Sequence, residues 1–576
     1  MAEWAVSAMS AGARRSALES LTARGAEYEL VERSVRGAAV CRVVRNAPRS
    51  VMDILLGARA FGDLEYLAYR DETYTFAEVI DQTARLAQAL ERLGVRRGDR
   101  VAVCMRNYPE WPASLFAPIA LGAVTVALNG WWSGEEIEYG LRDAGAGVLI
   151  ADGERLDRVR SRLSALGVLA VAVRTRHRVS DRIVLWDEAL GTAPDTHLSP
   201  VPSDPDDDCL MLYTSGSTSG PKGAVSTHRN VVHALLAWEI ENRAQAMLRE
   251  EPLPDEPFDV QYRMLVSIPF FHVTACHVCM LSALRLGRRL TLMHKWDVQE
   301  ALETIDRDRI THFISVPTVT GDLIRAAETS GRKLPSLLAI GGGGSHRPAK
   351  QVLAVPRALE NARPGTGWGM TETNAIGTQI AAPDYLQVPT SSGRCSLLMD
   401  MRIVDPDAGA DLPPGEVGEV WVRGTPVIRE YWNKPEATAQ AFRDGWFRTG
   451  DLAYVDDQEF VYFVDRIKDI VIRGGENISC LKVEDALYCC EGVAEAVAFG
   501  LPDERLGEEL AAVIVPRDGS RLTERGVRES MQRRVGRFEV PARIVIRNEP
   551  LPRIASGKFA KRKVREEVLA SLELSG

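Results

Sequence analysis

The sequence has 576 residues, of which 45% are hydrophobic and 26% charged, and its formal net charge is −9. This length exceeds what one hydrophobic core organises, so two or more domains are expected, and the composition is that of a globular protein. The negative charge argues against nucleic acid as the main partner, because such partners need a dominant basic face. Nine cysteines without paired spacings favour a reducing compartment, here the cytoplasm, over a disulfide framework.

Residues 1–48 have weak hydrophobic periodicity and form an N-terminal extension to which the sequence assigns no role. Charged residues interrupt the start of the chain, so no secretory signal is predicted. The most apolar run, residues 113–132, contains Pro118 and Gly122. Buried β-α-β packing is therefore expected there, and no integral membrane span.

From Val51 onward, short β-branched runs alternate with helical patterns. Residues 100–104 and 147–151 are predicted as buried strands, and residues 77–93 as an amphipathic helix. This alternation predicts a parallel sheet with crossover helices. Residues 241–261 are polar, acidic and proline-containing, which indicates an exposed insertion.

Between residues 388 and 464 the pattern changes to short strands with glycine and proline turns, which predicts a small β-rich subdomain. A smaller mixed unit follows, and within it residues 521–565 hold 14 Lys/Arg against 4 Asp/Glu. Two interpretations of this basic stretch stand side by side. It is a solvated helical surface, or a cationic rim for a polyphosphate such as coenzyme A.

The most informative segment is Tyr213-Thr-Ser-Gly-Ser-Thr-Ser-Gly-Pro-Lys-Gly223, which follows a strand-like stretch and precedes a helical one. Its glycines let backbone N–H groups approach phosphate oxygens, its hydroxyls add neutral donors, and Lys222 adds a point charge. The P-loop of nucleotide triphosphatases does not fit the spacing. Gly223 follows Lys222 where that motif needs a hydroxyl.

The segment resembles the phosphate-binding signature of the adenylate-forming (ANL) superfamily, which contains acyl-CoA synthetases, luciferases and peptide-synthetase adenylation domains. Further stretches match motifs of that family in its order along the chain: Pro269-Phe-Phe-His272, Gly341-Gly-Gly-Gly344, Gly367-Trp-Gly-Met-Thr-Glu372, Thr449-Gly-Asp451, Asp465-Arg-Ile-Lys468, Gly474-Gly-Glu-Asn477 and Pro552-Arg-Ile-Ala-Ser-Gly-Lys558. The likeness extends from about Val51 to the C-terminus, and it is to AMP-binding acyl-CoA synthetases of the fatty-acid type. The sequence departs from the family after the glycine turn, where Gly344 and Ser345-His-Arg347 replace the usual small residue and proline.

The resemblance implies an ATP site. Its expected residues are Thr214, Ser215, Gly216, Ser217, Thr218, Gly220 and Lys222 in the loop, Gly342, Gly343 and Gly344 in the glycine turn, Gly367, Trp368, Gly369, Met370 and Thr371 in the aromatic motif, and Asp451 with Arg466 at the ribose. Trp368 would cover the adenine ring, and Glu372 with Thr214 would hold Mg²⁺. Core packing for Trp368 and helix capping for Glu372 remain as structural alternatives.

Three further roles follow from the resemblance. Lys558 would stabilise the charge that develops between the acid and the α-phosphate, and His272 would orient the carboxylate or serve as a structural histidine. Lys468 would mark a hinge about which the C-terminal domain rotates before the second step. Gly474 and Gly475 would then face the pantetheine of coenzyme A.

The implied fold is α/β. A large N-terminal domain of two β-α-β subdomains and a small β-barrel-like subdomain precedes a small mobile α+β C-terminal domain. The expected boundaries are an extension over residues 1–48, an AMP-binding domain over residues 49–464, and a C-terminal domain over residues 465–576 that carries Lys558.

The implied function is ATP-dependent ligation of a small-molecule carboxylic acid to coenzyme A, and a homodimer is one expected assembly. The expected acyl-pocket residues carry no Lys or Arg, which favours a hydrophobic monocarboxylic acid, with a medium- to long-chain fatty acid placed first; they are Trp238, Phe271, Val273, Thr274, Phe313, Val316 and Gly341 to Gly344. Open alternatives are an aryl or benzoate-type CoA ligase, an acyl-AMP ligase that does not use CoA, and a non-catalytic nucleotide-binding relative. An amino-acid adenylation module is disfavoured, because the motif around His272 lacks an acidic residue.

Overall fold

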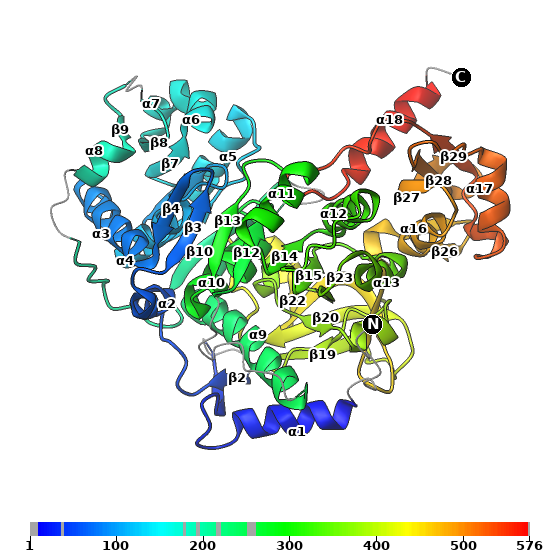
Figure 1. Ribbon diagram of the computed structural model, residues 1–576, viewed down its shortest axis with the longest axis horizontal. Coiled ribbons are helices and arrows are strands. Elements are labelled where there is room, and N and C mark those ends of the chain that lie inside the picture. The colour runs from blue at the N-terminus through cyan, green and yellow to red at the C-terminus, as the bar shows by residue number, and fades with distance from the viewer. Residues whose placement is uncertain are drawn as a thin grey trace.

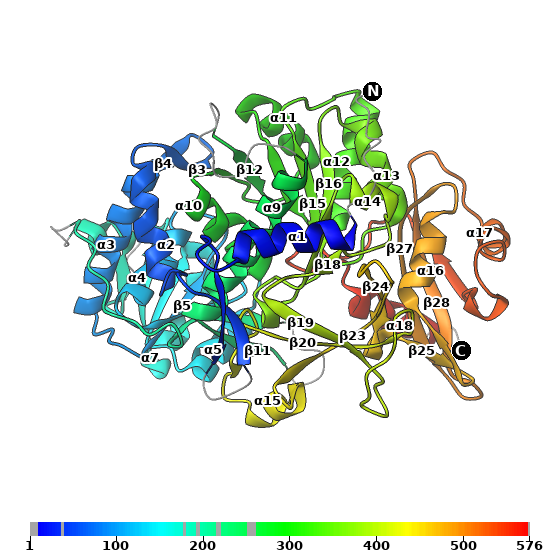
Figure 2. The same cartoon turned by 90° about the horizontal axis from the view of Figure 1, so that it is seen from below.

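The computed structural model describes residues 10–35, 40–176, 180–191, 196–214, 220–249 and 261–573. Two sheets with their helices form the body of the molecule, and the C-terminal residues form a lobe at one end, coloured orange to red in Figure 1. Figure 2 shows the N-terminal helix lying across the lower side of the body. Among the described helices, none is both long and apolar enough to cross a membrane.

The first sheet has eight strands in the order β21-β11-β10-β6-β5-β7-β8-β9. Their bounds are β5 Arg100–Cys104, β6 Val124–Ala127, β7 Val148–Asp152, β8 Leu169–Val173, β9 Ile183–Leu185, β10 Asp208–Thr214, β11 Lys222–Thr227 and β21 Glu430–Tyr431. The run from β10 through β6, β5, β7 and β8 to β9 is parallel, and helices α4 (Trp111–Ala120), α5 (Gly134–Ala144) and α6 (Gly153–Val159) lie in its crossovers. The predicted buried strands and parallel sheet are confirmed.

Helix α3 (Phe76–Arg92) confirms the predicted amphipathic helix, and its start has a local cause. The Thr75 hydroxyl accepts a hydrogen bond from the Glu78 backbone N–H, and the Glu78 carboxylate accepts one from the Thr75 N–H. This reciprocal capping satisfies two donors that a helix start leaves open. The apolar face of α3 then packs into the core.

The second sheet has nine strands in the order β18-β17-β16-β15-β14-β12-β13-β3-β4. Their bounds are β3 Glu65–Tyr69, β4 Glu72–Thr75, β12 Arg263–Val266, β13 Arg289–Leu292, β14 His312–Ser315, β15 Ala339–Gly343, β16 Arg363–Gly367, β17 Thr378–Ala381 and β18 Arg394–Cys395. Strands β13, β12, β14, β15 and β16 run parallel, so their carboxyl ends meet at one edge. His272, Gly344 and Trp368 all follow such ends, which is where α/β sheets bind ligands.

Helices surround the second sheet on both sides. They are α9 (His228–Arg249), a π-helix η3 (Thr274–Leu281), α10 (Ser282–Leu286), α11 (Val298–Asp308), α12 (Pro317–Ser330) and α13 (Ala349–Ala358). One hydrophobic cluster joins α9, η3 and the first sheet, while a separate cluster joins α11, α12 and α13. Two separate hydrophobic clusters therefore pack beneath the carboxyl-end edge of the second sheet.

The predicted β-rich subdomain is a five-stranded antiparallel sheet. Its strands are β19 Met399–Val404, β20 Gly418–Gly424, β22 Phe442–Arg443, β23 Trp446–Val455 and β24 Val461–Arg466. The C-terminal lobe follows β24 directly. It contains η5 (Ile467–Asp469), β25 Val471–Arg473, β26 Glu476–Ile478, α16 Cys480–Tyr488, β27 Val493–Asp503, β28 Gly507–Pro516, α17 Glu524–Met531, β29 Arg543–Ile546 and α18 Lys561–Glu573.

The N-terminal extension folds onto the body as helix α1 (Ala11–Thr22) and a hairpin of β1 (Leu30–Ser34) and β2 (Val40–Val44). Helix α1 packs against α9 (Figure 1). Buried Arg14 donates two hydrogen bonds of 2.7 Å to the Glu241 carboxylate. The prediction of an exposed insertion from residue 241 is therefore wrong for residues 241–249, because α9 continues to Arg249 and Glu241 is buried. Residues 250–260 lie outside the described residues.

Candidate functional site

The phosphate-binding segment connects two antiparallel strands. Thr214, at the end of β10, pairs with Lys222, at the start of β11, and its hydroxyl donates to the Lys222 carbonyl at 3.4 Å. Ser215, Gly216, Ser217 and Thr218 lie outside the described residues; Gly220 has a left-handed φ of 86°. Strand β11 follows this turn and α9 begins only at His228, whereas a helix directly follows the loop in a P-loop.

Lys222 and Glu372 are connected through Tyr431, a residue that the sequence did not single out. The Lys222 ammonium lies over the Tyr431 ring at 5.0 Å from its centre, and the Tyr431 hydroxyl donates to the Glu372 carboxylate at 2.7 Å. Strand pairing places Tyr431 there, because it stands opposite Ala224 of β11. Tyr431 lies in β21, about 200 residues after Lys222 in the sequence. No local sequence pattern therefore indicated its contact with Lys222 and Glu372.

Glu372 fits a magnesium ligand. It lies in a single 3₁₀ turn, Thr371–Thr373, and is 7% exposed. Burial raises the pKa of its carboxyl, although the Tyr431 hydrogen bond acts in the opposite direction. Among the described residues, no Lys or Arg forms an ion pair with it, and no cluster of three metal-ligating side chains exists. Mg²⁺ held by one carboxylate and substrate phosphates suits this arrangement.

Asp451 lies between Trp368 and Arg466. The Trp368 indole N–H donates to one carboxylate oxygen at 2.7 Å, and Arg466 Nε lies 2.9 Å from the other. The Trp368 ring stacks on Phe463 with centroids 4.9 Å apart. Asp451 raises the pKa of Arg466, and each oxygen of this buried carboxylate keeps a further lone pair for a hydroxyl.

The glycine turn follows β15 and lies beside the aromatic motif, since Gly343 pairs with Gly367 of β16. Gly344 has a φ of 78°, and a Cβ built there would stand 3.1 Å from Lys558 Cε. The backbone conformation and the close approach of Lys558 both favour glycine at this position.

Lys558 reaches the body of the molecule from the C-terminal lobe. Its segment is seated by Thr318, whose hydroxyl donates to the Gly557 carbonyl at 2.7 Å. Burial, and next the charge of Arg466, lower the pKa of Lys558 to about 8. Burial and the nearby Lys558 lower the pKa of His272 to about 3, and His272 Nε2 has no hydrogen-bond partner among the described residues. Neutral His272 and cationic Lys558 thus lie at the same carboxyl-end edge of the second sheet.

Gly474 and Gly475 are not brought to this edge, because they form the turn between β25 and β26. Lys468 lies in the exposed turn η5, where the charges of Arg466 and Asp451 act on its ammonium group. None of the contacts among the described residues joins the Gly474–Gly475 turn to Lys558, Glu372 or Asp451. Their expected roles in a second orientation of the lobe stay predictions.

The expected acyl-pocket residues divide between two cores. Phe271 and Val273 belong to the cluster with α9 and η3, whereas Phe313 is fully buried among α11 and α12 and stacks on Trp296. The prediction that Phe313 lines the pocket is therefore wrong, because side chains alternate along β14 and Ile314 points to the opposite face. Ile314 packs against the cluster that contains Phe271.

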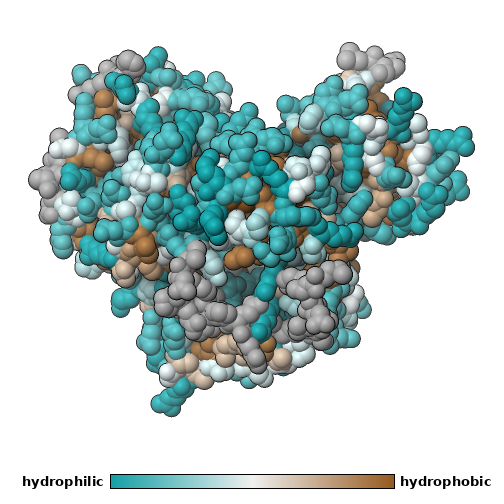
Figure 3. Space-filling model, in the orientation of Figure 1, coloured by the Kyte–Doolittle hydropathy of each residue, from teal (hydrophilic) through white to brown (hydrophobic). Residues whose placement is uncertain are grey.

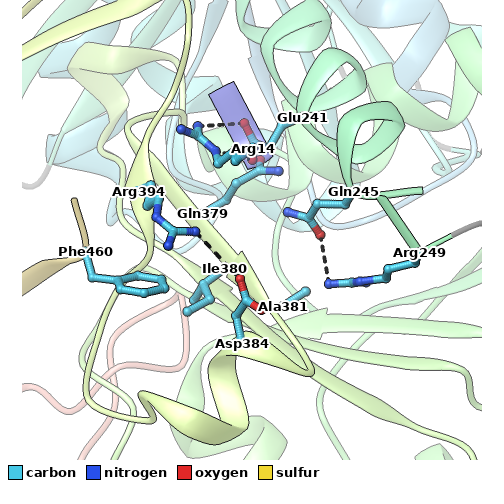
Figure 4. A pocket seen from close by; sticks show the side chains of 10 residues that line it. All are labelled: Arg14, Glu241, Gln245, Arg249, Gln379, Ile380, Ala381, Asp384, Arg394 and Phe460. Atoms are coloured by element: carbon cyan, nitrogen blue, oxygen red, sulfur yellow. Dashed lines mark hydrogen bonds and ion pairs between the residues drawn. The ribbon is translucent and has the colours of Figure 1, made fainter. Parts of the chain in front are cut away.

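A pocket elsewhere in the protein is lined by charged side chains from α1, α9 and β18 (Figure 4). Arg14 is bonded to Glu241 within it, and Arg394 lies 3.7 Å from Asp384. None of the predicted site residues lines this pocket. Arg249, which also lines the pocket, donates to the Gln245 side chain at 3.4 Å.

The AMP-binding enzyme family matches residues 57–432, and the AMP-binding enzyme C-terminal domain matches residues 482–558. The chain therefore belongs to the AMP-binding enzyme family, in which acyl-CoA synthetases use an acid, ATP and coenzyme A. Its similarity to curated relatives identifies it as an acyl-CoA synthetase within that family. It is 35% identical to a feruloyl-CoA synthase of Amycolatopsis sp, with 85% of this chain and 93% of the relative covered. It is 31% identical to a long-chain-fatty-acid–CoA ligase of Mycobacterium tuberculosis, with 87% and 94% covered.

Solved structures agree with this assignment. An anthranilate CoA ligase in complex with anthranoyl-AMP is 25% identical, with a TM-score of 0.82 and with 91% of this chain and 98% of that chain covered. An o-succinylbenzoate CoA synthetase from Bacillus subtilis, in complex with ATP and magnesium ion, is 26% identical, with a TM-score of 0.73 and with 89% and 99% covered. The α/β fold with a large N-terminal and a small C-terminal part is that of these enzymes.

Proposed function

We propose that this enzyme joins a hydrophobic monocarboxylic acid to coenzyme A in two steps, through an acyl-adenylate. The observation that carries the proposal is the position of Lys558. Its side chain lies against Gly344, beside neutral His272, and in the electrostatic field of Arg466 and Asp451. The two ATP-side groups, Glu372 and Asp451, are buried nearby with geometry suited to a cation and to ribose hydroxyls.

In the first step, a carboxylate oxygen of the acid attacks the α-phosphorus of ATP, and the bond to pyrophosphate breaks. Both reactants are anionic, so the site must neutralise charge and hold them in line. The Lys558 ammonium neutralises the oxygens between the acid and the α-phosphate, since with a pKa of about 8 it is mostly protonated at neutral pH. Magnesium supplies further charge neutralisation when it is bound at Glu372.

In the second step, the thiol of coenzyme A attacks the carbonyl carbon of the acyl-adenylate, the thiol proton is lost, and AMP leaves. An acyl-adenylate formed beside Lys558 would have this segment across the approach to its carbonyl carbon in the observed orientation. We therefore retain the rotation of the lobe about Lys468, with Gly474 and Gly475 contacting pantetheine afterwards. The exposed position of η5 and the short connection between β24 and the lobe support a hinge there.

We infer the substrate class from uncharged side chains that border the hydrophobic cluster joining α9, η3 and the first sheet. Trp238 on α9, Thr274 and Val278 on η3, and Ile314 on β14 are each half-buried, although most of their neighbours are fully buried. Thr274 and Val278 are four residues apart, about one turn of η3, and so lie on the same side of this helix. No charge among these residues would pair with a second carboxylate, which favours a hydrophobic monocarboxylate.

A medium- to long-chain fatty acid is our first candidate, and an aryl acid is the second. The aryl candidate is favoured by the likeness to a feruloyl-CoA synthase and to an anthranilate CoA ligase. A panel of saturated acids from butyrate to octadecanoate, with benzoate and ferulate, tests both. We expect CoA-dependent AMP release with at least one member of the panel. Pyrophosphate exchange without any thioester product would favour an acyl-AMP ligase, and no exchange with any acid would favour a nucleotide-binding relative.

Three broader expectations accompany this function. The domain boundaries stay at residues 49–464 and 465–576, and β24 spans the junction between them. A cytoplasmic location is supported by nine cysteines that are all free thiols. A homodimer stays a prediction that sedimentation of the purified protein can test.

A further inference from the structure

A contact between the body and the lobe involves the residues that depart from the family pattern after the glycine turn. His346 lies between β15 and α13, and its Nε2 is 2.9 Å from both carboxylate oxygens of Asp485 on α16. The side chains are 20% and 34% exposed, so solvent screens this pair only in part. The pair joins two elements that belong to different parts of the molecule.

Further contacts between lobe and body among the described residues involve the Lys558 segment itself. Arg553 lies 2.9 Å from Asp322 of α12, and Thr318 donates to the Gly557 carbonyl. Arg553 also lies 2.7 Å from Glu495 of β27, so this segment is joined to the lobe, and its contacts with the body belong to the observed orientation as well. His346 holds a second element of the lobe, α16, which follows the expected hinge.

We propose that the His346–Asp485 pair is a positioning contact that holds the lobe in the orientation used for adenylation and that breaks for thioester formation. This inference rests on the proposed two-step function. Any rotation of the lobe about residues 465–468 displaces α16 from the turn between β15 and α13, so the pair exists in one orientation only. Figure 3 shows a recess between the lobe and the part of the body around the first sheet.

The surroundings of His346 are acidic on the side of the lobe. Burial lowers the pKa of His346, but the hydrogen bond and charge of Asp485, with the charges of Glu484 on α16 and Asp465 at the end of β24, outweigh burial and raise that pKa. Lys561 of α18 is turned to Glu484 at 2.8 Å, and Arg347 is turned inward to Thr320. A protonated His346 therefore attracts the lobe. The attraction is full at low pH and is lost as pH rises through the raised pKa.

Separate assays of the two half-reactions test the proposal. Adenylation is measured as acid-dependent pyrophosphate exchange, with decanoate or ferulate, whichever the unmodified enzyme uses faster. Acyl transfer is measured as thioester formation from the matching synthetic acyl-adenylate and coenzyme A. His346→Gln and Asp485→Asn should each slow exchange about fivefold, the order expected for a partly exposed ion pair, and should leave acyl transfer unchanged or faster.

Variants that keep or remove the charge at residue 346 should differ in the pH dependence of the exchange rate. A purely structural role of His346 would not change this pH dependence. His346→Arg keeps the positive charge at every pH, so its exchange rate should match the unmodified enzyme at low pH and exceed it at high pH. In the double variant His346→Gln/Asp485→Asn the loss should equal that of either single change, because one contact is removed in all three. Glu529→Gln, which breaks an exposed Arg525–Glu529 pair within α17, is the matched control and should change neither half-reaction.

Equal loss of both half-reactions in His346→Gln, or unchanged exchange in both single variants, would overturn the positioning role. Thermal unfolding of each variant separates misfolding from mispositioning, and Asp485→Asn preserves side-chain shape for that purpose. Failure of the proposed function is recognised separately: the unmodified enzyme would then show no exchange with any acid.

Discussion

The Tyr431 hydroxyl donates a 2.7 Å hydrogen bond to the Glu372 carboxylate while the Lys222 ammonium lies over the same ring. One aromatic side chain thus fixes the acid expected to hold magnesium and the lysine expected to contact phosphate. Because Glu372 is buried, its ionised form depends on such partners.

Tyr431→Phe removes the hydrogen bond and keeps the ring. The pKa of Glu372 should rise further, so less of the carboxylate is available to the cation, and the magnesium concentration for half-maximal pyrophosphate exchange should increase about tenfold. Tyr462→Phe is the control, because Tyr462 donates to Asp456 away from the site. An unchanged magnesium dependence in Tyr431→Phe would remove Tyr431 from the metal site.

Lys558→Ala should lower the exchange rate by a factor of about 100 to 1,000, the usual effect of removing one donor to developing charge. ATP binding, measured by calorimetry, should persist, since Glu372 and Asp451 remain. Lys563→Ala on α18 removes an exposed lysine of the same lobe and should have no effect. Normal exchange without Lys558 would exclude it from the chemistry.

The pH profile follows from the same lysine. The pKa of Lys558 is lowered to about 8, so its ammonium form is present below that pH and is lost above it. Exchange should therefore fall as pH rises through about 8. In a background of His346→Arg, which removes the pH dependence of the His346–Asp485 pair, Lys558→Arg should lose this decline and retain a lower, flat rate. A decline at the same pH in the double variant would assign it to another group.

Asp451→Ala should weaken nucleotide binding about 10- to 100-fold, because two ribose hydroxyls lose a charged acceptor. It also leaves Arg466 without its partner and the Trp368 indole N–H without its acceptor. Asp400→Ala, which removes the carboxylate partner of Arg42 on β2 and Arg423 on β20, is the matched control. Equal ATP affinity in Asp451→Ala and the unmodified enzyme would contradict the ribose role.

Ile314 and Phe313 lie on opposite faces of β14, so substitutions at Ile314 should change acid preference and substitutions at Phe313 should change stability. Ile314→Phe or Thr274→Phe adds bulk beside the expected acyl chain, so activity with long acids should fall more than activity with short ones. Phe313→Leu should lower the unfolding midpoint, because it leaves a cavity in the core with Trp296, and should keep the acid profile. A changed acid preference in Phe313→Leu would contradict this assignment of faces.

Arg14→Ala would leave the buried Glu241 carboxylate without its cation. Loss of one partner of a buried pair costs about 3–5 kcal/mol, so the urea midpoint of the N-terminal part should fall clearly. Replacing both residues, Arg14→Met with Glu241→Leu, should restore most of the stability because no charge is then buried alone. Full stability of Arg14→Ala would show that the extension contributes little.

The sequence by itself determined the chemistry-bearing positions that lie within single short segments. The hydroxyl-rich loop before Lys222, the turns at Glu372 and Asp451, and the Ser-Gly turn before Lys558 have local patterns, because glycines and short polar residues are what such turns require. The buried strands and the amphipathic helix α3 were also predictable, since hydrophobic period and capping residues are local properties.

The tertiary structure decided which distant residues meet. Tyr431 reaches Glu372 only through the pairing of β21 with β11, and His346 reaches Asp485 only when the lobe stands against the body. The direction of Phe313, the burial of Glu241 and the packing of helix α1 on α9 likewise depend on strand register and helix packing. Such contacts join segments up to a few hundred residues apart, and no local pattern records which segment becomes the neighbour.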